Sequence, residues 1–348
     1  MKFKKLSLFA VALSSLFIGC NADKEKSLTI YSSRNEQLIK PVFDLYTQET
    51  GVKINFTTGK AGALTEKIKA EGKRTPADLL ITVDGGNLWN AKEKGILAPI
   101  KSEKLTKAIP AHLKDSENYW FGVSLRARTM VYHPERIKAG ELTSYEALAD
   151  STFKGRLVLR TSKKVYNQSL VSMLIDQHGE EKTKEVVSGW VNNLAIEPTS
   201  NDTKAMQALI DGKGDVTLVN TYYYGRMQKK DSNLALKIFW PNQVNEQPNK
   251  QNSDSISNSG VHINVSGIAL VAASKNQKEA TAFVEWLVTP KAQALFAELN
   301  MEYPVIEGVK LANQVEAWGL FKKSETAIST FGEKQAQAIR LMQSVDYK

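Results

Sequence analysis

The sequence predicts an α/β protein of about two domains, in which helices cover both faces of the sheets. Three observations support this fold class. Residues 27–58 show a strand, helix and strand pattern, and residues 78–83 form an almost wholly apolar strand of the kind found in sheets covered on both faces. Alternating strand and helix patterns then recur after residue 156. The 348 residues suffice for two buried cores.

The first element is a strand at 27–33, where polar and apolar residues alternate. Residues 36–50 follow with apolar side chains at helical spacing, and Gly51 ends that helix. Alternation resumes at 52–58, and a second helix is expected at 64–70. This order favours a parallel sheet with crossover helices.

The next segments repeat the alternation. After the strand at 78–83, the sequence Asp84-Gly85-Gly86-Asn87 is interpreted as an ordinary turn rather than a loop at the rim of a cleft. Residues 242–259 are polar and are expected to form a solvated connection. Strands are predicted at 156–160, 215–220, 236–240 and 265–272, and helices at 167–178, 204–211, 278–287 and 291–299.

Residues 1–20 have the form of an export signal. Lys2, Lys4 and Lys5 precede an apolar run at 6–18, which is too short to span a bilayer as a helix. Cys20 is the only cysteine, and its surroundings resemble a lipobox, in which the cysteine carries a lipid; residues 21–27 would then be a tether. The alternative is an ordinary signal peptide cleaved near Ala22. Both place the mature chain outside the cytoplasm, on the periplasmic or outer cell-surface side.

Composition excludes several classes of function. The 46 basic residues exceed the 37 acidic ones, for a net charge of +9, but they are scattered along the chain, so nucleic-acid binding is not expected. No segment after the signal is apolar enough to span a membrane. The four histidines are isolated, and the sequence lacks a nucleophile motif, a phosphate-binding glycine loop and a paired-carboxylate motif. An exported enzyme is therefore the weakest hypothesis.

Four short motifs carry a resemblance to a known family. They are Thr-Ile-Tyr-Ser-Ser-Arg (29–34), Pro-Ala-Asp-Leu (76–79), Val-Tyr-Asn-Gln-Ser-Leu (165–170) and Val-Asn-Thr-Tyr-Tyr (219–223). The first two are widespread among periplasmic binding proteins, and the last two resemble the ferric-iron-binding branch. The chain from residue 27 to about 345 thus resembles the solute-binding components of iron(III) ABC importers.

This resemblance implies a type II periplasmic binding protein fold with two lobes, each a doubly wound sheet, and a ligand in the cleft between them. By analogy, lobe 1 comprises residues 28–125 and 255–300, and lobe 2 comprises residues 126–254 and 301–348. The partners implied are ferric iron and an ABC permease. A monomer is expected, attached to the membrane only through the N-terminal lipid.

Tyrosines are the expected metal ligands. Ferric iron is a hard cation that prefers anionic oxygen to imidazole or thiolate. The adjacent tyrosine ligands of the family match Tyr222 and Tyr223, which follow an Asn-Thr pair, and its third tyrosine matches Tyr166. We expect the chain to leave the strand in a turn that points both Tyr222 and Tyr223 into the cleft, with Tyr224 in a packing role. The alternative is a plain aromatic cluster at a strand end.

The opposite lobe departs from the family pattern. Relatives carry His-Tyr or His-Glu-like ligands where this chain has Asn35 and Glu36. Asn35 is a weak ligand, and Glu36 either binds the metal or only complements the helix dipole. Some members complete the coordination with a carbonate-like anion, and Arg34 and Arg126 are the candidates to bind one. The alternative for each Arg is a surface ion pair.

The leading hypothesis is therefore capture of ferric iron by hinge closure, followed by delivery to an ABC importer. The alternative is a binding protein for an organic solute such as a polyamine or a sugar, in which the tyrosines would form a stacking platform.

Overall fold

The computed structural model describes residues 26–243 and 258–348. The export signal, Cys20, nearly all of the tether and the middle of the polar connection lie outside the described residues. Within the described residues, no helix combines the length and the apolar character that a membrane crossing needs.

The strands run from the N-terminal segment to residue 271. They are β1 (Ser27–Ser32), β2 (Lys53–Thr58), β3 (Leu79–Thr82), β4 (Leu97–Ala98), β5 (Trp120–Tyr132), β6 (Leu157–Val158), β7 (Val216–Asn220), β8 (Lys237–Phe239) and β9 (Ile263–Val271).

Helices fill the connections and the C-terminal segment. The α-helices are α1 (Glu36–Thr50), α2 (Ala61–Glu71), α3 (Gly85–Glu93), α4 (Glu103–Ala108), α5 (Val165–Asn192), α6 (Asp202–Ile210), α7 (Thr221–Lys230), α8 (Gln277–Leu287), α9 (Pro290–Asn300), α10 (Asn313–Glu316), α11 (Thr330–Glu333) and α12 (Gln335–Ser344). Short 3-10 helices are η1 (Gly72–Arg74), η2 (Ala111–Leu113), η3 (Ala139–Glu141), η4 (Glu146–Ala149) and η5 (Ser151–Phe153).

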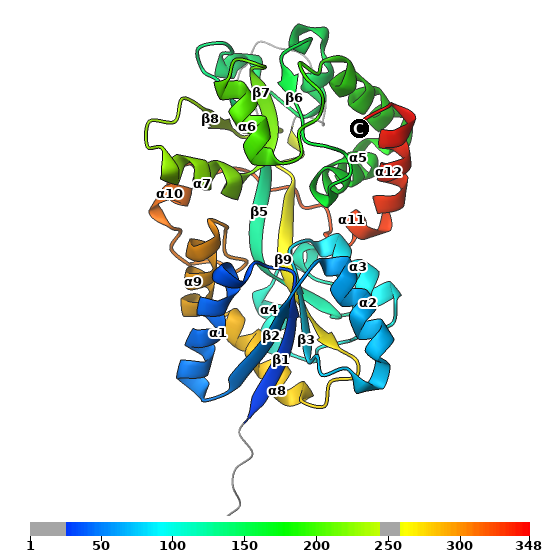
Figure 1. The fold of residues 1–348 in the computed structure, drawn as a ribbon, viewed down its shortest axis with the longest axis vertical. Helices are drawn as coiled ribbons and strands as arrows, with labels where there is room; N and C mark the ends of the chain where they lie inside the picture. Colours follow the sequence, from blue (N-terminus) through cyan, green and yellow to red (C-terminus); the bar gives the residue numbers. More distant parts are fainter. Residues whose placement is uncertain (1–25, 244–257) are drawn as a thin grey trace, which may run out of the picture.

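Two long strands join the two ends of the molecule. The strand order is β2-β1-β3-β9-β5-β7-β6, with β4 paired to β9 and β8 paired to β5. β5 pairs with β9 as far as Ala127 and with β7 from Arg128 onward, so it belongs to two sheets in turn. Figure 1 shows β5 and β9 running side by side between the lower and upper lobes. The predicted lobe boundary after residue 125 falls within β5, close to this change of partner.

Helices lie on both sides of each sheet. In the lower lobe of Figure 1, α1 and α9 cover one side and α2 and α3 the other; in the upper lobe, α6 and α7 lie opposite α5 and α12. Hydrophobic side chains of these helices and of the fully buried strands β3, β5, β7 and β9 form the core. The predicted doubly wound α/β class is confirmed.

The sheets are mixed rather than purely parallel. β1 pairs in parallel with β2 and β3, as the opening pattern predicts, and β6 pairs in parallel with β7. However, β9 is antiparallel to β3, and β5 is antiparallel to both β9 and β7. The reason is that β5 and β9 carry the chain between the lobes in opposite directions, so neither arrives by a right-handed crossover within one lobe.

The turn predicted at residues 84–87 is wrong, because these residues begin α3. Asp84 is the N-cap, and its carboxylate accepts a hydrogen bond of 2.9 Å from the backbone N–H of Gly86. A Cβ on Gly85 would lie 2.0 Å from Ile328, so only glycine allows this close approach to the segment before α11.

Candidate functional site

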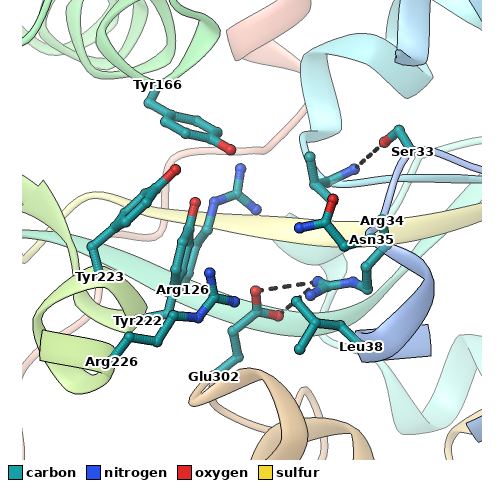
Figure 2. Close-up of a pocket in the computed structure, with 11 residues that line it drawn as sticks. Ser33, Arg34, Asn35, Leu38, Arg126, Tyr166, Tyr222, Tyr223, Arg226 and Glu302 are labelled. Atoms are coloured by element: carbon teal, nitrogen blue, oxygen red, sulfur yellow. Dashed lines mark hydrogen bonds and ion pairs between the residues drawn. The ribbon is translucent and has the colours of Figure 1, made fainter. Parts of the chain in front are cut away.

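A pocket of about 230 Å³ lies where the two lobes face each other. The residues in its wall come from the link between β1 and α1, from the first turn of α1, from the segment after β3, from β5, from the first turn of α5, from α7 and from the segment after α9 (Figure 2). They are Ser33, Arg34, Asn35, Leu38, Val83, Arg126, Tyr166, Tyr222, Tyr223, Arg226 and Glu302.

The three predicted tyrosines meet in this pocket. Tyr166 lies in the first turn of α5, and Tyr222 and Tyr223 lie in the first turn of α7. The ring centroids of Tyr222 and Tyr223 are 4.5 Å apart. Figure 2 shows all three hydroxyls pointing into the same space. The side-chain amide of Asn220 donates a hydrogen bond of 3.3 Å to the Tyr222 hydroxyl and so helps to position it.

The expected turn after the strand is wrong, because α7 begins directly after β7, at Thr221. Adjacent residues in a helix project about 100° apart, so both tyrosine side chains can face one side, which a continuing strand would forbid. Tyr224 takes the packing role: it is buried against Trp318, and its hydroxyl donates to the backbone oxygen of Leu236 at 3.1 Å. The helix starts also add unpaired backbone N–H groups, which favour negative charge at the tyrosine oxygens.

Burial keeps the phenols of Tyr166 and Tyr222 protonated in the protein without a bound cation. Burial is the main cause that raises the pKa of Tyr222 well above 10, and repulsion from ionised Tyr166 and Tyr223 adds to it. Burial also raises the pKa of Tyr166, although the Arg126 guanidinium partly offsets this effect. Only a strongly polarising ligand would therefore ionise the cluster near neutral pH.

Three arginines surround the tyrosine rings. The guanidinium carbon of Arg160 lies 4.9 Å from the centroid of the Tyr166 ring, and that of Arg126 lies 5.4 Å from the same centroid. Arg226 lies 5.0 Å from the centroid of the Tyr222 ring. One terminal nitrogen of the buried Arg126 has no hydrogen-bond partner, and this side chain lines the pocket. Arg126 thus presents a free donor close to the tyrosines.

Arg34 lines the pocket but has other partners. Its guanidinium forms an ion pair of 3.0 Å with Glu302 and donates to the side chains of Asn300 and Ser266. Both residues of the ion pair are buried, with 4% of each side chain exposed. Because both terminal nitrogens are engaged, Arg34 holds the wall of the pocket together in this conformation and offers no free fork to an anion. Glu302, whose carboxylate also accepts from the Ser124 hydroxyl, carries no sequence signal that would identify it.

The two residues predicted on the opposite lobe differ in one respect: both line a neighbouring depression, but only Asn35 also lines the tyrosine pocket. Asn35 is exposed and lines the tyrosine pocket. Glu36 is also exposed, but it lines a neighbouring depression together with Gly59 and Lys60 and is not part of the pocket wall. As the acidic residue in the first turn of α1, it is placed to complement the helix dipole.

Asp84 connects the lobes behind the pocket and is fully buried. One carboxylate oxygen lies 3.2 Å from Arg126 and 2.8 Å from the amide of Asn264, and it accepts from the Ser169 hydroxyl at 3.2 Å. Burial raises the pKa of Asp84, and the charge of Arg126 opposes the increase. Ser169 follows Tyr166 by one turn of α5, so this contact links lobe 1 to the helix that carries a predicted ligand.

Metal ligands of the more common kinds do not gather elsewhere. In residues 26–243 and 258–348, no group of three His, Cys, Asp or Glu side chains is arranged to hold a metal ion.

The comparisons with known proteins decide the family. Residues 42–323 match the family described as bacterial extracellular solute-binding protein. Iron uptake protein A1 of Synechocystis is 39% identical over 331 residues, which are 93% of this chain and 88% of that protein. This chain belongs to the periplasmic ferric-iron-binding family of bacterial extracellular solute-binding proteins.

Solved structures of this ferric-iron-binding family share the fold. The Trichodesmium protein IdiA (FutA), in complex with iron and citrate ligands, is 40% identical with a TM-score of 0.86 and covers 92% of this chain and 100% of its own. The ferric binding protein of Campylobacter jejuni is 33% identical with a TM-score of 0.82 and covers 92% of this chain and 100% of its own. The type II binding protein fold is therefore confirmed, and the family is one of solute-binding proteins, not enzymes.

Proposed function

We propose that this chain binds ferric iron outside the cytoplasm through Tyr166, Tyr222 and Tyr223 and delivers it to an ABC-type importer. The observation that carries the proposal is that three tyrosine hydroxyls, from the first turns of two helices, point into one small pocket between the lobes. The similarity to Iron uptake protein A1 and to the Trichodesmium protein with iron and citrate supports iron as the cargo.

The charges around the pocket suit a trivalent cation with a small anion. Three phenolates offset the charge of +3, which matters because an unpaired buried charge is very costly. Arg126, Arg160 and Arg226 add positive charge near the rings. We therefore assign to Arg126, with its unpartnered nitrogen, the binding of carbonate or a similar synergistic anion. Arg34 instead positions the pocket wall through Glu302.

Asn35 is the one residue of the predicted pair on lobe 1 that faces the tyrosines. Its side-chain oxygen is a weak neutral ligand, so we assign it a secondary role at the open side of the coordination shell. Glu36, which lines the neighbouring depression, is left out of the ligand set.

Organic solutes fit the pocket less well. A volume of about 230 Å³ is below the roughly 300–1,000 Å³ of sites for larger ligands. A polyamine would also face Arg126 and Arg226 in the pocket wall, and like charges repel. A sugar would find only three aromatic rings, all with hydroxyls directed inward.

Delivery would use closure about the strands β5 and β9. The Asp84 contacts with Ser169 and Arg126 join β5 and α5 to the start of α3, and their loss would favour opening of the pocket. The permease would recognise the closed, loaded protein. We further propose that the protein acts as a monomer on the periplasmic or outer cell-surface side and is anchored by a lipid on Cys20.

Metal loading tests the proposed function. Metal-free protein is mixed with ferric citrate, separated from small molecules, and examined for iron content and visible absorbance, since ferric phenolates absorb visible light. We expect one iron per chain and a reddish protein. Tyr223→Phe should lose most of the absorbance, whereas the neighbouring control Tyr224→Phe should keep it. A colourless protein that retains no iron would exclude the proposal.

A further inference from the structure

A second depression, with a volume of about 440 Å³, adjoins the tyrosine pocket on the outer side of α7. We call it the cationic bay. Its wall consists of Thr203 in the first turn of α6 and of residues from α7, and the two pockets share Tyr223 and Arg226. The residues of the bay are Thr203, Tyr223, Arg226, Met227, Lys229 and Lys230.

No carboxylate of the wall compensates the charge of the bay. Its wall contains three cations and no carboxylate, and none of Arg226, Lys229 and Lys230 forms an ion pair with another described residue. Lys229 and Lys230 are exposed, and neither pairs with a carboxylate one helical turn away, as Lys40 and Lys107 do. Three clustered unpaired cations attract anions and raise their local concentration.

Tyr223 links the bay to the pocket. Its side chain is half-buried and lines both cavities, whereas Tyr166 and Tyr222 line only the inner one. A ligand resting in the bay would therefore meet the Tyr223 side chain before it reaches the other two tyrosines. Arg226 lies beside the same passage and contacts the ring of Tyr222.

We propose that the cationic bay is a docking subsite for anionic ferric chelates of the polycarboxylate class, and that Tyr223 is the first tyrosine to replace a chelator oxygen on the iron. The inference rests on the proposed function, because it supplies the route by which iron reaches the tyrosines. Ferric iron bound by several carboxylates carries a net negative charge, which suits Lys229 and Lys230.

The transfer is a ligand exchange without a change of oxidation state. One bond between iron and a chelator carboxylate oxygen breaks, and one bond between iron and the Tyr223 oxygen forms. The proton of the Tyr223 hydroxyl passes to the released carboxylate or to water. Tyr222 and Tyr166 then replace further chelator oxygens in the inner pocket, and the freed chelator leaves through the bay.

The rate of iron loading tests the bay separately from the metal site. Visible absorbance is followed by stopped flow after metal-free protein is mixed with ferric citrate, which is anionic, or with ferric tris-maltolate, which is uncharged. The variant is Lys229→Glu/Lys230→Glu, and Lys229→Gln/Lys230→Gln repeats the test without reversing charge at the end of a helix. The control, Lys275→Glu/Lys278→Glu, makes the same change of charge at two exposed, unpaired positions near the start of α8.

At low ionic strength, we expect the charge-reversed variant to load from ferric citrate about tenfold more slowly than wild type. The Gln variant should fall between them, and the control should match wild type. Loading from maltolate should be equal in all four proteins, and added salt should remove the differences. Equal rates of loading from ferric citrate in wild type and in the charge-reversed variant would refute the docking role of the bay. Equal slowing of the variant with both chelates would refute it as well. The absorbance at the end of loading tests the proposed function separately. If wild type develops no visible absorbance, the tyrosine site itself is refuted.

Discussion

Loading of iron should release protons in proportion to the number of tyrosines that bind it. Burial raises the pKa of Tyr166 and of Tyr222 above 10, so both are protonated in the metal-free protein throughout the range from pH 5 to 8. Coordination of iron requires the phenolate. Each ligand therefore loses one proton on binding, and three protons should leave per iron when Tyr223 is included.

The size of the effect follows from proton linkage. One proton released on binding changes the binding free energy by about 1.4 kcal/mol per pH unit. Three protons give about 4 kcal/mol, or about a thousandfold in Kd per pH unit. The sign is fixed, because protons compete with iron for the same oxygens: affinity falls as the pH falls. Because the pKa values of both buried phenols lie above 10, the slope should persist across the whole range from pH 5 to 8.

The assay is competition with a chelator of known proton linkage between pH 5 and 8, combined with direct measurement of proton release in weakly buffered solution. Tyr166→Phe and Tyr222→Phe should each lower the proton count by one and the slope by about tenfold per pH unit. Tyr224→Phe, whose hydroxyl bonds to a backbone oxygen, should retain the wild-type slope. A slope near zero, or a proton count unchanged by all of these substitutions, would refute phenolate ligation.

Three further predictions concern the walls of the site. Asp84→Asn leaves the buried Arg126 without a carboxylate, so we expect the free energy of unfolding to fall by about 3 kcal/mol and the radius of gyration from X-ray scattering to increase. If both values are unchanged, Asp84 does not hold the lobes together. Glu36→Gln should leave the iron affinity unchanged in the same chelator competition. Asn35→Asp should raise the affinity, because it adds a hard anionic oxygen that faces the tyrosines. The reverse pattern would identify Glu36, and not Asn35, as a ligand of the iron. Arg128→Ala removes a buried cation that makes four hydrogen bonds within lobe 2, so the free energy of unfolding in denaturant should fall by about 3–5 kcal/mol. A decrease below about 1 kcal/mol would show that these hydrogen bonds contribute little net stability.

Elements with regular apolar spacing could be predicted from the sequence. The helix expected at residues 36–50 coincides with α1, and the strand at 215–220 coincides closely with β7. The sequence pattern does not predict β5, although all of its residues are buried. Its polar side chains break the apolar pattern, and they are buried only because Asp84 and Asp202, distant in the sequence, pair with Arg126 and Arg128.

The sequence predicts only those parts of the candidate site that lie in local motifs. Short motifs identified the three tyrosines, because each lies in a local sequence at the start of a helix. Arg160, Arg226 and Glu302 reach the site only through the packing of separate elements, so no local pattern identifies them. That Asn35 reaches the tyrosine pocket and Glu36 does not likewise depends on the direction in which α1 begins, which sequence spacing does not determine.

The most direct test is a crystal structure of the iron-loaded protein with anomalous diffraction recorded at the iron absorption edge. We predict a single strong anomalous peak between the lobes, within bonding distance of the oxygens of Tyr166, Tyr222 and Tyr223. A peak at another position, or iron bound without contact to these three oxygens, would contradict the account.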